Sequence, residues 1–174
     1  PPTDSLRKER SLTGVKIRAF DLKWCPTEPL RIAAVGENNG CIWNVGGGGA
    51  SSNPVVFCDT EIMRCNWHPD GNVLLTGNAQ GKIAVRSAAD GKPMATLDAH
   101  EDEVYGIEVL SNEGLLAVGA GATVQLWDLN TATGPAQATL AAKQGGLVFG
   151  GDHRNPERKA YLFSMAARGR VLCA

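Results

Sequence analysis

The chain has 174 residues, a formal net charge of -1, 43% hydrophobic residues and 6% aromatic residues. This length allows one domain with a sizeable core. The near-neutral charge argues against general nucleic-acid binding, which needs a basic stripe on the surface. No run of 18 apolar residues occurs in the sequence, so no membrane-spanning segment is predicted.

The five cysteines of the chain are Cys25, Cys41, Cys58, Cys65 and Cys173. Their number is odd, and no two of them form a Cys-x-x-Cys pair. Several fall within strand-like runs, where a free cysteine behaves as a small buried hydrophobe. These features favour a reducing compartment, the cytoplasm or the nucleus, and they predict no metal site.

The first 14 residues, PPTDSLRKERSLTG, are polar and charged, and we expect a loose arm without the apolar segment of a signal peptide. From Val15 onward the sequence consists of short apolar runs separated by Gly, Pro, Asn and Asp. Apolar and polar residues alternate in several runs, as in KIAVRS at 82–87 and TVQLWDL at 123–129. Helical periodicity is absent over any useful length. The pattern predicts an all-β domain over residues 15–174.

The strand-like runs also repeat along the chain. AFDLKWCP aligns with IMRCNWHP, which places Trp24 over Trp67, 43 residues later. In the runs that follow, Gly36, Gly77 and Gly119 recur at intervals of 41 and 42 residues. A recurrence of about 42 residues with four strands in each unit is the signature of a β-propeller blade.

The spacing predicts blades at approximately 15–57, 58–98, 99–140 and 141–174. The last unit contains YLFSMAARGRVLCA, which repeats two strands of the earlier units. Its interval is longer because DHRNPERK, at 152–159, is expected to be a surface insertion. The chain therefore holds about three and a half predicted blades.

The third unit, DAHEDEVYGIEVLSNEGLLAVGAGATVQLWDL, resembles the WD40-repeat family through His100 and the Trp127-Asp128 pair. WHPDGNVLLTGNAQGKIAVRS in the second unit and WCPTEPLRIAAVGENNGCIWNV in the first support the resemblance. The resemblance implies an incomplete WD40-type β-propeller without a cofactor. It also implies structural roles for His100, Trp127 and Asp128.

The chain departs from the family pattern within the blades. In the family, a buried His, a Ser or Thr, a turn Asp and the Trp form a hydrogen-bonded network, and only His100 and Trp127 match it here. The turn Asp is replaced by Gln80 in the second unit. Because a complete network is worth more than its separate bonds, we expect these blades to be less rigid than well-formed ones.

The chain also departs from the family pattern in length. Family propellers typically close with about seven blades. An open fan would leave unpaired backbone groups and apolar blade faces at its ends. We therefore expect a fragment of a longer propeller, or a partner chain that completes it.

The resemblance places the residue before the first strand of each blade on the narrow face, around the central channel. Together with neighbouring charged residues, these positions form a predicted protein-binding rim: Arg18, Asp59, Glu61, Asp98, Glu101, Asp102 and Glu103. Clustered carboxylates favour a basic peptide segment and accelerate its association. The alternative interpretation is an ordinary solvated run of charges.

Three sequence features raise the question of catalysis. The glycine-rich run at 44–54 lacks the Gly-Lys-Ser/Thr ending of a phosphate loop and is interpreted as a connection. Cys65 and His68 are close in sequence, but the Pro-Asp-Gly turn that follows directs them apart, and no third group orients them. His100 already has a structural role by resemblance. The sequence therefore predicts no catalytic residues and no enzyme activity.

The sequence favours a non-catalytic scaffold that mediates protein–protein interactions within a larger assembly, in the cytoplasm or the nucleus. The alternative is a component of a ribonucleoprotein or chromatin complex. In that case Arg7, Lys8 and Arg10 of the arm would help to make indirect contact with nucleic acid. The fold alone does not decide between these two functions.

Overall fold

The computed structural model describes residues 11–16, 18–46, 53–109, 115–120, 123–129, 143–148, 166–168 and 171–173. Every secondary-structure element within these ranges is a β-strand, so the all-β prediction is confirmed. The same ranges contain no helix long and apolar enough to cross a membrane.

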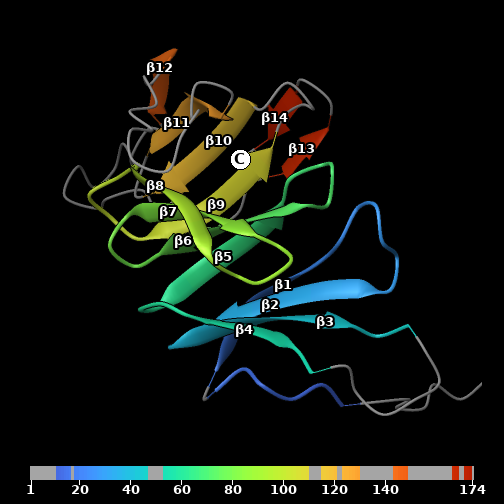
Figure 1. Ribbon diagram of the computed structural model, residues 1–174. Helices are drawn as coiled ribbons and strands as arrows, with labels where there is room; N and C mark the ends of the chain where they lie inside the picture. Colours follow the sequence, from blue (N-terminus) through green and yellow to red (C-terminus); the bar gives the residue numbers. More distant parts are fainter. Residues whose placement is uncertain are drawn as a thin grey trace, which may run out of the picture.

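The strands form three four-stranded antiparallel sheets and one hairpin (Figure 1). The first sheet contains β1 (Ala19–Trp24), β2 (Arg31–Gly36), β3 (Asn39–Asn44) and β4 (Val55–Cys58). The second contains β5 (Ile62–Trp67), β6 (Val73–Asn78), β7 (Lys82–Ser87) and β8 (Pro93–Asp98). The third contains β9 (Val104–Val109), β10 (Leu115–Ala120), β11 (Thr123–Asp128) and β12 (Lys143–Val148). The hairpin pairs β13 (Ala166–Arg168) with β14 (Val171–Cys173).

The outer strand of the third sheet lies later in the chain than the sequence spacing indicated. Residues 143–148 pair with β11 in the third sheet, whereas the approximate spacing of the repeat places them in a fourth unit at 141–174. The difference arises because the connection between β11 and β12 is longer than its counterparts in the first two sheets. A fixed repeat length cannot anticipate an insertion inside a unit.

The three sheets repeat one another in strand register. The second residue of each second strand pairs with an equivalent residue of the third strand: Ile32 with Trp43, Leu74 with Arg86, and Leu116 with Trp127. Each pairing of first and second strands also has an irregularity at the same end of the sheet. This register identifies equivalent positions in the three units.

Close approach between neighbouring sheets explains one of the recurring glycines. A Cβ atom on Gly77 would lie 2.5 Å from Val104 Cγ1, on the inner strand of the next sheet. Real Cβ atoms do not approach other atoms so closely, so any larger residue here would displace β9.

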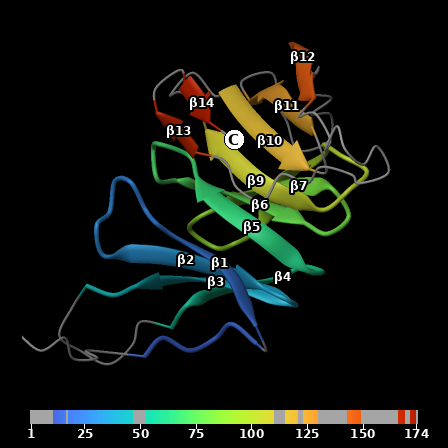
Figure 2. The same ribbon diagram turned by 180° about the vertical axis from the view of Figure 1, so that it is seen from behind.

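The inner strands β1, β5 and β9 lie side by side at the centre of the stack (Figures 1 and 2). Trp67 Nε1 donates a 2.9 Å hydrogen bond to the Lys23 carbonyl, and Asn66 Nδ2 donates one of 2.9 Å to the Ile107 carbonyl. Each neighbouring pair of sheets is therefore joined by bonds between inner strands. The sheets that the structure describes are stacked as blades and do not close into a ring.

Apolar side chains fill the spaces between the sheets, and each sheet relies on its neighbour for burial. The cluster between the first and second sheets contains Cys25, Ala33, Val35, Ile42, Phe57, Ile62, Cys65, Trp67, Leu74 and Ala88. The cluster between the second and third contains Leu75, Ile83, Leu97, Ala99, Val104, Ile107, Leu116, Val118 and Trp127.

The last described part of the N-terminal segment lies against the first sheet. Trp43 Nε1 donates to the Thr13 carbonyl at 2.9 Å, and Asn39 Nδ2 donates to the Gly14 carbonyl at 2.7 Å. The Lys16 amide donates back to Asn39 Oδ1 at 2.8 Å. The predicted loose arm over 1–14 is thus held by side chains of β3 where it is described, and residues 1–10 lie outside the described ranges.

Candidate functional site: a rim of connecting segments

Two segments carry most of the predicted rim. Residues 59–61 connect β4 to β5, and residues 99–103 connect β8 to β9. Each leads from the outer strand of one sheet to the inner strand of the next. The side chains of these segments therefore lie where neighbouring sheets meet.

Backbone hydrogen bonds fasten the first connecting segment to two turns. The Glu61 amide donates to the Glu37 carbonyl at 2.8 Å, and the Glu61 carbonyl accepts from the Ala79 amide at 3.0 Å. In the first sheet the Arg18 carbonyl accepts from the Glu37 amide at 3.2 Å in the same way. Arg18 and Glu61 thus occupy equivalent places before their inner strands.

The backbone of Glu61 adopts a left-handed conformation, with φ of 39°. A residue with a Cβ atom adopts this conformation at a cost of about 1–2 kcal/mol. The hydrogen bonds on both sides of Glu61 hold it there. Its side chain is exposed at the rim.

Asp59 turns inward and does not extend the exposed rim. Its carboxylate pairs with the guanidinium of Arg86, which is only 4% exposed. Arg86 also donates to Thr76 Oγ1 at 3.1 Å and to the Gly91 carbonyl at 3.3 Å, and it stacks 4.8 Å from the Phe57 ring centre. Asp59 therefore serves as the counter-ion of a buried arginine.

The positive charge of Arg86 is buried and is paired with the carboxylate of Asp59. Burial lowers the pKa of Arg86, while the charge and hydrogen bond of Asp59 oppose this shift. An arginine stays protonated in proteins, so the unit carries a buried ion pair. Removing one partner of such a pair is costly because the other charge stays buried. Sequence reasoning missed this network, although the repeat places Arg86 where the other two sheets have tryptophan.

The third unit uses His100 in its connecting segment. The ring nitrogen Nε2 of His100 donates a 3.0 Å hydrogen bond to the Val118 carbonyl. Burial lowers the pKa of His100 below its ordinary value of 6.5, although the Val118 bond and the charge of Asp102 oppose the shift. His100 is therefore neutral at pH 7 and fixed by a backbone contact.

Trp127 is buried, and its Nε1 donor has no hydrogen-bond partner among the described residues. The register places Val118 of β10 where Thr76 stands in the second sheet. Thr76 accepts a bond from Arg86, whereas a valine side chain accepts none. The hydrogen-bonded network of the family is thus incomplete in the third sheet, where the Trp127 indole has no partner among the described residues. Asp128 follows Trp127 at the end of β11.

Three of the remaining rim residues have a side-chain partner, although Arg18 and Asp98 are themselves exposed. Arg18 forms a 3.3 Å ion pair with Glu37, Asp98 forms one of 2.5 Å with Lys82, and Glu103 accepts a hydrogen bond from the Tyr105 hydroxyl. Three further rim carboxylates are exposed and have no ion pair in the described part of the chain: Glu61, Glu101 and Asp102.

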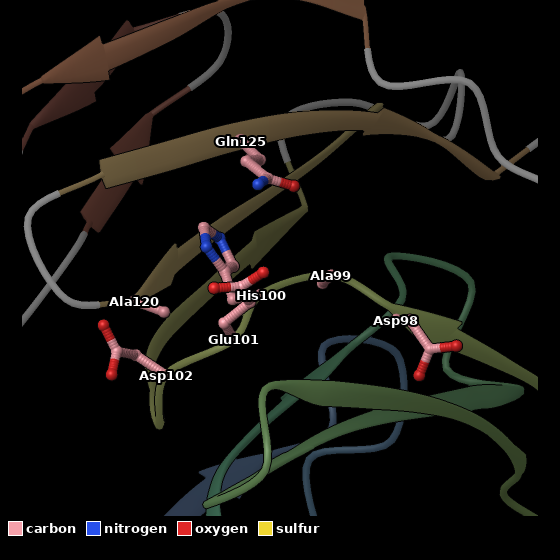
Figure 3. Close-up of a pocket in the computed structure, with 7 residues that line it drawn as sticks. All are labelled: Asp98, Ala99, His100, Glu101, Asp102, Ala120 and Gln125. Carbon is pink, nitrogen blue, oxygen red and sulfur yellow. The ribbon is translucent and has the colours of Figure 1, made fainter.

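An open pocket of about 590 Å³ lies beside the second connecting segment. Figure 3 shows its lining residues, with the His100 ring between the segment and Gln125, Asp102 beside Ala120, and Asp98 apart from the other carboxylates. The lining consists of Asp98, Ala99, His100, Glu101, Asp102, Ala120 and Gln125. Three carboxylates and two neutral polar side chains give this pocket an acidic character.

The features that raised the question of catalysis have structural roles where they are described. Cys65 is buried, and burial raises the pKa of its thiol well above the ordinary value. His68 Nδ1 lies 3.0 Å from Asp70 Oδ1 in the turn before β6. Residues 47–52 of the glycine-rich run lie outside the described ranges. No group of three or more potential metal ligands occurs among the described residues.

Known proteins resemble this chain in sequence and in fold. The family described as "Anaphase-promoting complex subunit 4 WD40 domain" matches residues 21–113, just over half of the chain. Pre-mRNA-processing factor 19 homolog 2 of Arabidopsis thaliana is 28% identical over 107 residues, which is 60% of this chain and 20% of the relative.

Two solved structures share the fold at 17% sequence identity. The structure titled "Crystal structure of RRP9 WD40 repeats" matches with a TM-score of 0.67, over 91% of this chain and 43% of that chain. "Structure of U3-55K" matches with a TM-score of 0.66, over 91% of this chain and 44% of that chain. The chain thus spans a fifth of the curated relative and less than half of each solved structure. The family match and the repeated four-stranded sheets confirm the resemblance, and the chain belongs to the WD40-repeat family.

Proposed function

We propose that this chain is a non-catalytic scaffold that holds proteins together in a larger assembly. Members of the WD40-repeat family are generally non-catalytic scaffolds, which supports the proposal. The observation that carries it is the set of exposed carboxylates on firmly bonded connecting segments: Glu61, Glu101 and Asp102. Sites held on a rigid frame bind with a smaller loss of conformational freedom.

The rim is proposed to bind a basic peptide segment of the partner protein. Exposed carboxylates on neighbouring segments attract positive charge and raise the association rate, and salt screens this attraction. Asp59 and Glu103 are excluded from direct contact in this proposal because they bond to Arg86 and Tyr105. They are proposed to position the segments on which the exposed residues stand.

The test is affinity capture with mass spectrometry, followed by rate measurements on the captured partner. We expect Glu61→Lys to slow association several-fold at low salt, with a smaller effect at high salt. The matched control is Glu28→Lys, a charge reversal in the exposed β1–β2 turn at the other end of the first sheet, which also breaks the ion pair of Glu28 with Arg31. Equal effects of the two variants would contradict a rim-specific contact.

We also propose that a further β-sheet covers the outer face of the first sheet, supplied by another segment or by a partner chain. Leu22 and Trp24 on β1 are 56% and 55% exposed. Trp67, the equivalent residue of β5, is 3% exposed and bonds to Lys23 of the preceding sheet. Trp24 has the same place in its sheet and no preceding sheet among the described residues.

A second candidate function is membership of an RNA-processing assembly in the nucleus, with only indirect contact to nucleic acid. The name of the Arabidopsis relative, a pre-mRNA-processing factor, favours it. We expect capture from nuclear extract to recover protein partners that persist after ribonuclease treatment. Direct binding of RNA at moderate salt would contradict the indirect contact, since the chain has a net charge of -1.

A further inference from the structure

We propose that the pocket between the second connecting segment and β11 receives an arginine side chain of the partner. This inference rests on the proposed scaffold function and names the chemistry that one part of the rim recognises. It follows from comparing two equivalent junctions within the same chain.

The junction between the first and second sheets contains its own arginine. Arg86 extends from β7 to the connecting carboxylate of Asp59 and stacks on Phe57. The remaining guanidinium donors bond to Thr76 and the Gly91 carbonyl. The fold of this repeat thus accommodates a guanidinium between a third strand and a connecting segment.

The junction between the second and third sheets has a tryptophan where the first junction has this arginine. Trp127 stands at the position of Arg86, because each pairs with the second residue of its neighbouring strand. The connection is also longer here, with residues 98–103 between Leu97 and Val104, where 58–61 lie between Phe57 and Ile62. The longer segment carries Glu101 and Asp102, and no cation of the described part of β11 meets them.

The pocket offers groups that suit a guanidinium. Glu101 and Asp102 supply carboxylates from the connecting segment, and the amide of Gln125 supplies a carbonyl acceptor on the β11 side (Figure 3). His100 is bonded to Val118 through Nε2, so its ring forms a fixed neutral wall. A guanidinium has five donors in a planar fork, whereas an ammonium is a compact point charge, so a site with acceptors on several sides favours arginine.

The first experiment is an NMR titration of the chain with a capped Gly-Gly-Arg-Gly-Gly peptide. We expect shifts at His100, Gln125 and Asp102, and at least fivefold weaker binding when lysine replaces arginine. The citrulline peptide, a neutral isostere, is expected to bind at least tenfold more weakly. Equal binding of the arginine and citrulline peptides would overturn the proposal.

The second experiment changes the pocket. We expect the double variant Glu101→Gln, Asp102→Asn to weaken arginine-peptide binding at least fivefold, and the control Glu28→Gln, in the exposed β1–β2 turn outside the rim, to change it less than twofold. Gln125→Arg supplies an internal cation from the position of β11 that corresponds to Ala84 in the second sheet, and it is expected to abolish binding. Unchanged peptide binding in Gln125→Arg would contradict the assignment.

These outcomes separate the pocket from the scaffold proposal. Captured partners that bind the double variant normally would overturn the pocket and leave the scaffold function standing. Arginine-peptide binding at the pocket without any captured partner would support the pocket chemistry and contradict the scaffold function. A thermal midpoint close to that of the parent chain in the double variant shows that lost binding is not lost folding.

Discussion

The same register position in the third strand of each sheet holds a side chain with a hydrogen-bond donor, and this donor has a different environment in each of the three sheets. Trp43 donates to the N-terminal segment, Arg86 pairs with Asp59, and the Nε1 donor of Trp127 has no partner among the described residues. The side chain at this register position is buried in all three sheets. A buried donor requires an acceptor from whatever lies against that face, and among the described residues such an acceptor is present in the first two sheets.

The unpaired indole of Trp127 leads to a prediction at Val118. Val118→Thr would place a hydroxyl where Thr76 stands in the second sheet, and we expect a gain of about 0.5–1.5 kcal/mol in unfolding free energy. Denaturant unfolding measures this gain.

The matched background for this substitution is Trp127→Phe, which removes the indole donor. There, Val118→Thr is expected to cost stability, because a buried hydroxyl without its partner loses hydration. A similar loss in both backgrounds would show that the two side chains do not meet.

At the scale of the strands, the close approach of the second and third sheets depends on glycine, which has no side chain, at position 77. Gly77 faces β9, and an added Cβ atom would lie 2.8 Å from Val104 Cβ as well as 2.5 Å from its Cγ1. The contact is between β6 and the inner strand β9, and β9 also accepts the Asn66 hydrogen bond that joins the two sheets. The sheet spacing is therefore sensitive to volume at this point.

We expect Gly77→Ala to lower the unfolding free energy by about 1–3 kcal/mol through overpacking. Adding Val104→Ala is expected to recover part of this loss, since it removes Cγ1, the nearer of the two Val104 atoms in conflict, while Cβ remains. Calorimetry on the two single variants and the double variant gives the coupling between them. Additive losses in the double variant would exclude a direct conflict.

The sequence predicted the strands well because alternation and turn residues are local signals. The recurring glycines and tryptophans also predicted the repeated sheets, since equivalent positions face equivalent neighbours. The inward turn of Asp59 was not predicted, because its direction depends on the backbone of a short connection and on Arg86 from another strand. The place of β12 was not predicted either, because the longer connection before it breaks the spacing.

At the scale of the whole molecule, the sheets form an open stack whose first face is only partly covered. Ile32, Cys41 and Trp43 are buried with Val15 of the N-terminal segment packed against them, while Trp24 remains exposed. An exposed apolar face of this kind favours association with another sheet.

We therefore expect the chain alone to bind a hydrophobic dye and to scatter light as associated species. Leu22→Glu with Trp24→Glu is expected to reduce both signals without lowering the unfolding free energy, because both side chains are exposed. The matched control is Trp67→Glu, which buries a charge in the equivalent place and is expected to unfold the chain. A compact monomer that binds no dye would contradict the proposal.

The bonds between β3 and residues 13–16 also provide a local reporter. The Lys16 amide has a side-chain acceptor, Asn39 Oδ1, although its segment pairs with no strand. Its hydrogen exchange therefore records detachment of the N-terminal segment separately from opening of the sheets. Trp43, bonded to Thr13, would sense the same event through its fluorescence.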